Sequence, residues 1–202
     1  MRKRREIDSI YDSALKYFAR YGYKKATLDN IALDLNMTNA NLYSYAKNKR
    51  QLYCDCVYYA VDEFLSRLKD LLSCIEDPYE KLDFIWDNTL GVILENKNFC
   101  EILVADNLSQ YATHSDDPWI SVNTTFVDFA TSYFAIPYEP NEEDPLGFSF
   151  APSTSAEMTV TIYKSQIVFP YLLGNQTQAL KNLKYMKNLL KYGLLNRGVC
   201  FV

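Results

Sequence analysis

A run of polar side chains between residues 38 and 50 has the chemistry needed to bind a polyanion. Threonine, asparagine and tyrosine supply hydrogen-bonding groups, and the basic residues Lys47, Lys49 and Arg50 follow them. Such side chains hydrogen-bond to phosphate oxygens, and a short Thr or Asn can approach the base edges in the major groove of DNA. Plainer interpretations stay open, because the charged run could be a solvated face and Tyr45 could pack on a preceding helix.

Two short helices must position these side chains. Thr27 is expected to cap the first, which carries apolar residues at helical spacing. Asn36 is expected to reverse the chain in the left-handed conformation, which Asn tolerates better than most residues. Thr38 then caps the second helix, on which Leu42 points inward. The pattern predicts a helix-turn-helix within residues 27–53.

Longer helices flank this stretch. An apolar stripe predicts a first helix over residues 6–21 that ends at Gly22, preceded by a basic arm at residues 2–5 that is either solvated or lies along phosphates. Asn48 is expected to cap the helix that follows, which runs to about residue 75. This last helix joins the head of the chain to its body and is the natural lever between them.

The charge of the chain is unevenly distributed. The formal net charge is −4, yet residues 1–50 contain 11 Lys and Arg against 5 Asp and Glu, whereas residues 51–202 contain 10 against 20. A head of +6 on a body of −10 indicates that only the head faces a polyanion. With 49% hydrophobic residues, the chain can bury a sizeable core.

The body is predicted to be helical. Asp77, Pro78 and Glu80 give a strong helix start for a segment that ends near residue 96. Further helices are expected over residues 99–108 and from residue 117 onward. Residues 109–116 and 137–152 have the composition of loops.

The segment 154–172 has two interpretations. Its MTVTIY run alternates and is β-branched, which fits a strand, but a capping box of Thr154 and Glu157 precedes it and favours a helix. Pro170 is expected to kink this helix and Gly174 to end it. In the last helix a leucine stripe lies on one side and a row of lysines lies on the opposite side. We interpret the lysine row as a solvated face.

The head resembles the N-terminal domain of TetR-family transcriptional regulators over about 45 residues. An aromatic residue and a Gly close the first helix, a Thr opens the second, Ile-Ala lies within it, Leu-Tyr lies in the third, and a Lys begins the fourth. These features are Phe18, Gly22, Thr27, Ile31, Ala32, Leu42, Tyr43 and Lys49. The chain departs from the family pattern at Asn36, Ala40 and Ala46, so the family does not predict its operator.

This resemblance implies an all-α chain with an N-terminal three-helix helix-turn-helix domain (residues 1–50) and a C-terminal helical ligand-binding and dimerisation domain (residues 51–202). The implied partner is double-stranded DNA with a palindromic operator, bound by a homodimer that forms through the last two helices. An intrachain core would give the same leucine stripe. The expected DNA-binding residues are Thr27, Thr38, Asn39, Asn41, Tyr43, Tyr45, Lys47 and Lys49.

The body is rich in aromatic residues, which suit a pocket for a small-molecule effector but also suit an ordinary core. The expected mechanism is a repressor released from DNA when the effector shifts the population of conformations. The candidate ligand-binding residues are Trp86, Tyr111, Trp119, Phe126 and Tyr133.

Other classes of protein are less well supported. The chain lacks the common catalytic motifs and has one histidine, so we expect no enzyme, no metal site and no cofactor. Five cysteines without C-x-x-C spacing, a charged N-terminus and the absence of a long apolar run predict a cytoplasmic protein outside the membrane. A thiol-based redox-sensing regulator and a helix-turn-helix protein without an effector remain alternatives.

Overall fold

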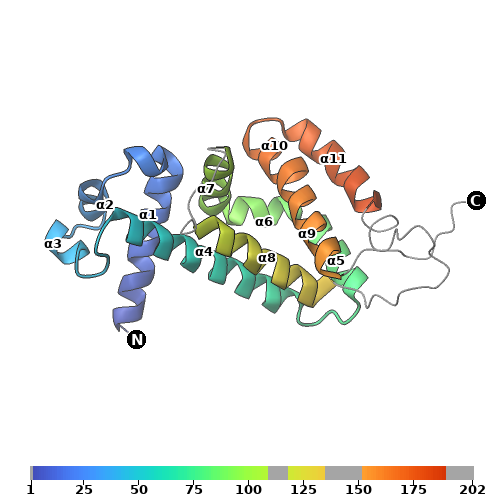
Figure 1. Ribbon diagram of the computed structural model, residues 1–202, viewed down its shortest axis with the longest axis horizontal. Helices are drawn as coiled ribbons and strands as arrows, with labels where there is room; N and C mark the ends of the chain where they lie inside the picture. The colour runs from blue at the N-terminus through green and yellow to red at the C-terminus, as the bar shows by residue number, and fades with distance from the viewer. Residues whose placement is uncertain (1, 109–117, 135–151, 190–202) are drawn as a thin grey trace, which may run out of the picture. The chain divides into compact units, whose positions relative to one another are not determined.

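The computed structural model describes residues 2–108, 118–134 and 152–189, and every regular element in this part is helical (Figure 1). The predicted all-α fold is confirmed. The helices are α1 (Arg2–Lys25), α2 (Leu28–Asp34), α3 (Asn39–Leu42), α4 (Lys49–Leu72), α5 (Pro78–Asp87), α6 (Thr89–Glu95), α7 (Lys97–Leu108), α8 (Pro118–Phe134), α9 (Pro152–Tyr163), the π-helical turn η1 (Lys164–Val168), α10 (Phe169–Leu172) and α11 (Gln176–Leu189).

The chain divides into two compact units. Unit 1 consists of Met1–Arg67 and Asn96–Val122, and unit 2 consists of Leu68–Glu95 and Asn123–Val202. Both α4 and α8 therefore contribute residues to each unit. A functional boundary between residues 50 and 51 stays a prediction, since compactness alone does not test it.

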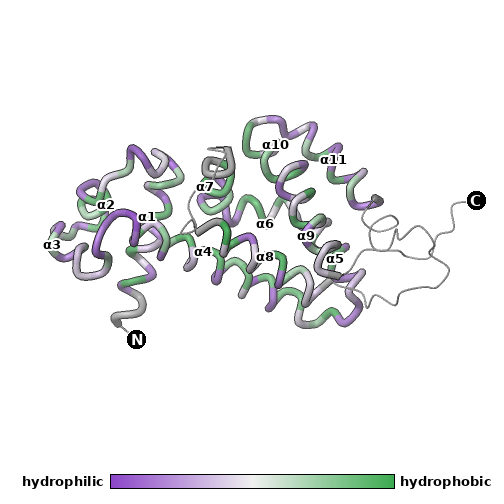
Figure 2. Tube along the Cα trace, viewed as in Figure 1, coloured by the Kyte–Doolittle hydropathy of each residue, from purple (hydrophilic) through white to green (hydrophobic). Residues whose placement is uncertain are grey.

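The core of unit 1 contains the apolar stripes of its helices. Ile10 and Phe18 of α1, Ile31 of α2, Leu42 of α3 and Leu52 of α4 are almost fully buried. Along the helices, hydrophobic and hydrophilic residues alternate as amphipathic packing requires (Figure 2). Burial of these side chains holds the two short helices, which would be marginal in isolation.

The turns and caps of the helix-turn-helix match their predictions. The backbone N–H of Asn30 donates to Thr27 Oγ1, and that of Asn41 donates to Thr38 Oγ1, so both threonines are N-caps. Asn36 has a φ of 51° and reverses the chain between α2 and α3. Gly22 has a φ of 73° and a ψ of 159°, which is non-helical, so the first helical stretch of α1 ends there as predicted, and a short turn follows to Lys25.

Unit 2 departs from the predictions in two places. Asp77 caps α5 as expected, but the segment predicted to run unbroken to residue 96 is interrupted at Asn88 and resumes as α6. The second departure concerns Thr154, which lies inside α9 because this helix begins at Pro152. The capping-box prediction was therefore wrong, although the preference for helix over strand is confirmed.

Pro170 interrupts the backbone hydrogen bonds of its helix, and a side chain of another helix replaces one of them. Proline has no N–H, so the carbonyl four residues earlier, on Gln166, loses its α-helical donor. The side-chain amide of Asn182 on α11 donates to that carbonyl instead, at 2.9 Å. The π-helical turn η1 precedes this point, and Gly174 ends the segment with a φ of 88°. Thus Asn182 joins α11 to the irregular part of the preceding helix.

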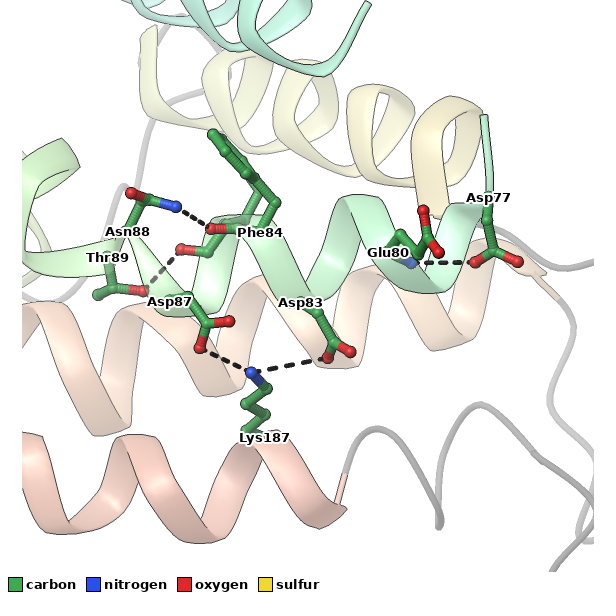
Figure 3. A network of polar contacts seen from close by, with 9 residues as sticks. Asp77, Glu80, Asp83, Phe84, Asp87, Asn88, Thr89 and Lys187 are labelled. Carbon is green, nitrogen blue, oxygen red and sulfur yellow. Dashed lines mark hydrogen bonds and ion pairs between the residues drawn. The ribbon is translucent and has the colours of Figure 1, made fainter. Parts of the chain in front are cut away.

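The lysine row of α11 is not uniformly solvated. Lys187 Nζ lies 2.7 Å from a carboxylate oxygen of Asp87 and 3.9 Å from one of Asp83, both on α5 (Figure 3). Lys181 and Lys184 are exposed, as predicted. Large apolar side chains on α10–α11 and the turn between them are also exposed, namely Leu173, Leu180 and Tyr185.

Some predictions lie outside the described residues. These are the loops at residues 109–116 and 137–151, together with the leucines of the last helix beyond residue 189. Within the described ranges, no helix combines the length and apolar character needed to cross a membrane.

Candidate nucleic-acid interface and effector site

The N-termini of α2 and α3 expose the predicted DNA-contacting hydroxyls. Thr27 and Thr38 are both exposed, and each Oγ1 accepts a backbone N–H in its cap. A hydroxyl that accepts in this way still has its own O–H to donate. Each threonine can therefore cap its helix and donate to a phosphate oxygen at the same time.

The outward face of α3 and the segment after it expose further polar groups. Asn41, Tyr43 and Lys47 are exposed, with about half of Tyr43 accessible to solvent. Ser44 Oγ donates to the Asn41 backbone carbonyl at 2.7 Å, so this contact does not engage the Asn41 side-chain amide. These three residues are the most available of the predicted set.

Two predicted base-facing residues are already engaged by carboxylates. The Asn39 side-chain amide donates to Asp29 on α2, and the Tyr45 hydroxyl hydrogen-bonds to Glu6 on α1. The bond to Glu6 raises the pKa of Tyr45. The structure thus gives both side chains a role in linking helices, and their contact with DNA stays a prediction.

Lys49 occupies a different kind of site from the predicted phosphate contact. Its Nζ donates to the backbone carbonyls of Tyr23 (2.8 Å), Lys24 (3.4 Å) and Ala26 (3.1 Å). It also lies 4.6 Å from the centroid of the Tyr23 ring. An ammonium has three N–H donors, and here all three are directed at the C-terminal end of α1, where a cation also suits the helix dipole. Its predicted role on DNA remains untested.

The predicted effector residues have different surroundings. Trp86 is buried, and its ring meets Tyr163 of α9 edge-to-face with centroids 5.4 Å apart. Its indole Nε1–H has no hydrogen-bond partner among the described residues. Tyr133 is half-buried, stacks on Phe129 at 4.5 Å and lies under the ammonium of Lys81, and Phe126 is half-buried.

Two of the predicted effector residues lie partly or wholly outside the described structure. Tyr111 lies outside the described ranges, and Trp119 is described by its backbone alone, in the first turn of α8. The predicted set is therefore not tested as a set. Of its members, Trp86 has the most unusual surroundings, because a buried donor without an acceptor is costly.

Lys164 was not among the predicted residues. It is half-buried at the start of η1, and its Nζ donates to Asn123 Oδ1 on α8 at 2.6 Å. Burial lowers its pKa, and no carboxylate opposes that shift. The available signal in the sequence was Lys164 itself, the one lysine of residues 152–172, directly after the apolar-rich run MTVTIY.

The buried cysteines are poor candidates for redox sensing. Burial raises the pKa of Cys56 well above its usual range and that of Cys100 to about 12. The thiolate is the reactive form, so neither thiol is activated. Cys54 is half-buried and Cys74 is exposed, while Cys200 lies outside the described residues.

Comparisons with known proteins agree with this geometry. The family model of the bacterial regulatory proteins of the tetR family matches residues 10–55. The negative transcriptional regulator IcaR of the Staphylococcus epidermidis biofilm operon icaADBC is 36% identical over 85 residues, which is 40% of this chain. The match spans 45% of the length of IcaR, so it concerns less than half of that relative.

Solved structures with the same fold cover nearly the whole chain. The fatty acid degradation regulator FadR from Bacillus halodurans has a TM-score of 0.71 at 16% identity, covering 93% of this chain and 98% of that one. FadR from Bacillus subtilis, in complex with stearoyl-CoA, has a TM-score of 0.70 at 14% identity, covering 92% and 98%. At such identities the likeness concerns the fold. The tetR-family model thus matches the part of the chain that contains the helix-turn-helix, and the solved structures share the fold of the whole chain.

Proposed function

We propose that this protein is a sequence-specific DNA-binding transcriptional regulator, and not an enzyme, that represses its target genes. The observation that supports this most directly is the exposed set on the helix-turn-helix: the capping hydroxyls Thr27 and Thr38, the side chains Asn41 and Tyr43, and the cation Lys47. Thr27 and Thr38 are the N-caps of α2 and α3, and helix N-termini suit phosphate contacts. A regulator of bacterial genes works in the cytoplasm.

The proposed roles within this set differ. Thr27, Thr38, Tyr43 and Lys47 bind phosphates, and Asn41 reads a base edge. Asn39 and Tyr45 contact nearby bases or DNA backbone only if they first release their carboxylate partners. Lys49 stabilises the end of α1, in addition to any contact that it makes with a phosphate. These assignments are drawn from exposure and from the hydrogen bonds each side chain already makes.

A homodimer gives this small interface its specificity. One short recognition helix buries little DNA surface, whereas two copies read both halves of a palindrome. The exposed apolar side chains Leu173, Leu180 and Tyr185 support association through α10 and α11. Light scattering after size exclusion should give a dimer mass for the full chain and a monomer mass for Tyr185→Glu, with Tyr58→Glu on α4 as the control.

A small-molecule effector in unit 2 would release the protein from DNA. Support comes from the buried, unsatisfied Trp86 and from the FadR structure that holds stearoyl-CoA. Because α4 contributes to both units, it is the proposed mechanical link between effector and DNA. Trp86, Phe126 and Tyr133 of unit 2 remain effector candidates. The side chains of the other two candidates, Tyr111 and Trp119, are not described by the structure.

The test is a selection of genomic fragments by the full chain, followed by fluorescence polarisation on the enriched palindrome and on a scrambled copy. Lys47→Met should weaken binding to both DNAs and reduce the slope of log affinity against log salt by about 1, while Lys69→Met serves as the matched control. Asn41→Ala should weaken binding to the palindrome by about tenfold or more and leave the affinity for the scrambled DNA unchanged. Equal affinity of the wild type for both DNAs would contradict the proposal.

A further inference from the structure

Unit 2 contains a half-buried cation, Lys164, that has no carboxylate partner among the described residues. In this part of the chain its polar contact is the neutral amide oxygen of Asn123. Among the described residues it forms no ion pair, unlike Lys187, which has two carboxylates. A cation partly removed from water without an anionic partner is unfavourable, so an anion bound next to Lys164 would stabilise it.

Lys164 and Asn123 both have N–H groups without an acceptor among the described residues. Because Asn123 turns its oxygen toward the ammonium, its Nδ2 amide group points to the other side and has no partner among the described residues. Lys164 itself uses one of its three N–H donors there. An oxyanion placed between the ammonium and the amide would accept from both. Neither group could serve a cationic or donor-only ligand.

A second donor without an acceptor among the described residues, the Trp86 indole N–H of α5, lies on a ring packed against the adjoining turn of α9. Tyr163 precedes Lys164 and packs against Trp86, whose buried indole N–H lacks an acceptor. The π-helical turn begins at Lys164, and such turns interrupt α-helices frequently at functional sites. Ile167 and Val168 of the same turn are buried, as are Phe129 and Ala130 of α8. Apolar surroundings with a few donors suit an amphipathic ligand.

We propose that Lys164 and Asn123 form the head-group subsite of the effector, and that the effector is an amphipathic anion with a carboxylate or phosphate ester head and an apolar body. This inference rests on the proposed function and adds the chemical class of the effector and the residue that recognises it. Lys164 makes a charge-assisted hydrogen bond to the head group, while Asn123 holds the ammonium in place in the empty state and donates from Nδ2 in the bound state.

The test is calorimetric titration of the full chain with three eight-carbon probes: sodium octanoate, octyl phosphate and 1-octanol. At least one anion should bind about tenfold or more tighter than the alcohol, which corresponds to one charge-assisted hydrogen bond. Which anion binds tighter decides between a carboxylate and a phosphate head. Lys164→Met should remove the preference and Lys164→Arg should keep part of it, while Lys181→Met, an exposed lysine of α11, should behave as wild type.

Two outcomes would overturn the inference: octanol binding as tightly as both anions, or Lys164→Met retaining the preference while circular dichroism shows it folded. Operator affinity measured on the same preparations without any probe tests the proposed function separately. A protein that binds its palindrome but shows no preference for an anionic head group contradicts the proposed subsite and leaves the regulator proposal intact. One that prefers anions but lacks any preferred DNA contradicts the regulator proposal.

Discussion

Each of the two units contains a half-buried lysine, Lys49 in unit 1 and Lys164 in unit 2, and the two ammonium groups have different hydrogen-bond partners. In unit 1, Lys49 donates to three carbonyls and lies over the Tyr23 ring. In unit 2, Lys164 has a single amide oxygen. The first arrangement satisfies every donor from within the fold. The second leaves donors and charge without partners among the described residues, so we expect Lys49 to stabilise its unit and Lys164 to destabilise its own.

This difference separates a structural lysine from one held ready for a partner. A residue that serves stability is surrounded by groups that match it, whereas a binding residue is left unmatched until its ligand arrives. Lys187 gives a third case, since it lies nearer the surface and pairs with the carboxylates of Asp83 and Asp87. The three lysines should therefore respond differently to the same substitution.

The largest effect is expected at Lys49. Lys49→Met leaves three carbonyls at the end of α1 without their donor, and two of these contacts are partly buried. We expect a loss of about 2–3 kcal/mol in the free energy of unfolding, measured by urea denaturation. Lys47→Met, which removes an exposed charge two residues away, should change stability by less than about 0.5 kcal/mol. Equal losses of stability in the two variants would contradict the structural role of Lys49.

The opposite sign is expected at Lys164. Lys164→Met removes a half-buried cation with no anionic partner, so the unliganded protein should become more stable. Partial exposure of the side chain reduces the penalty, and we expect a gain of about 1 kcal/mol, or a rise in Tm of about 2–4 °C for a chain of this size. Differential scanning calorimetry measures this shift. A fall in Tm would show that Lys164 is structural like Lys49.

The stabilisation by Lys164→Met should depend on pH. Burial lowers the pKa of Lys164 in the folded protein below its usual value of 10.5. As pH rises through the folded pKa, the folded state loses this proton while the unfolded chain keeps it, so the wild type gains stability relative to the variant. The difference in unfolding free energy should be constant at lower pH and shrink toward zero near pH 10.5. A difference that grows with pH would contradict the sign of the pKa shift.

The smallest effect is expected at Lys187. Lys187→Met removes its contacts with Asp87 and Asp83 (Figure 3), and such partly exposed pairs contribute about 0.5 kcal/mol. Salt screens exposed pairs, so the loss measured by urea denaturation at low ionic strength should vanish at about 1 M salt. Lys184→Met, exposed on the same helix, is the control and should show no salt-dependent loss.

Local features of the fold were largely predictable from the sequence. The caps at Thr27, Thr38 and Asp77 and the left-handed turn at Asn36 depend on a few neighbouring residues, and each appears as predicted. Where a prediction failed, a local signal was misleading. Thr154 and Glu157 have capping-box spacing, but the helix starts earlier, at Pro152, because proline suits a first turn.

The surroundings of the candidate site residues were much less predictable. The carbonyls that accept from Lys49 are on Tyr23, Lys24 and Ala26. The carboxylates that bind Asn39 and Tyr45 are on Asp29 and Glu6. Such pairings join separate helices, and spacing along one helix contains no information about them. Lys164 was overlooked for the same reason, because its burial depends on α8, which is about 40 residues away in the sequence.

The bond from Asn182 to the Gln166 carbonyl has a consequence for register. That carbonyl is accessible at one place along the chain because Pro170 supplies no N–H there. If α11 slid by one turn along its neighbour, the amide would lose its acceptor and the carbonyl would be left unsatisfied. Pro170 thus determines the position of α11 along its neighbour. This position in turn determines where the exposed side chains of Leu180 and Tyr185 lie on the surface.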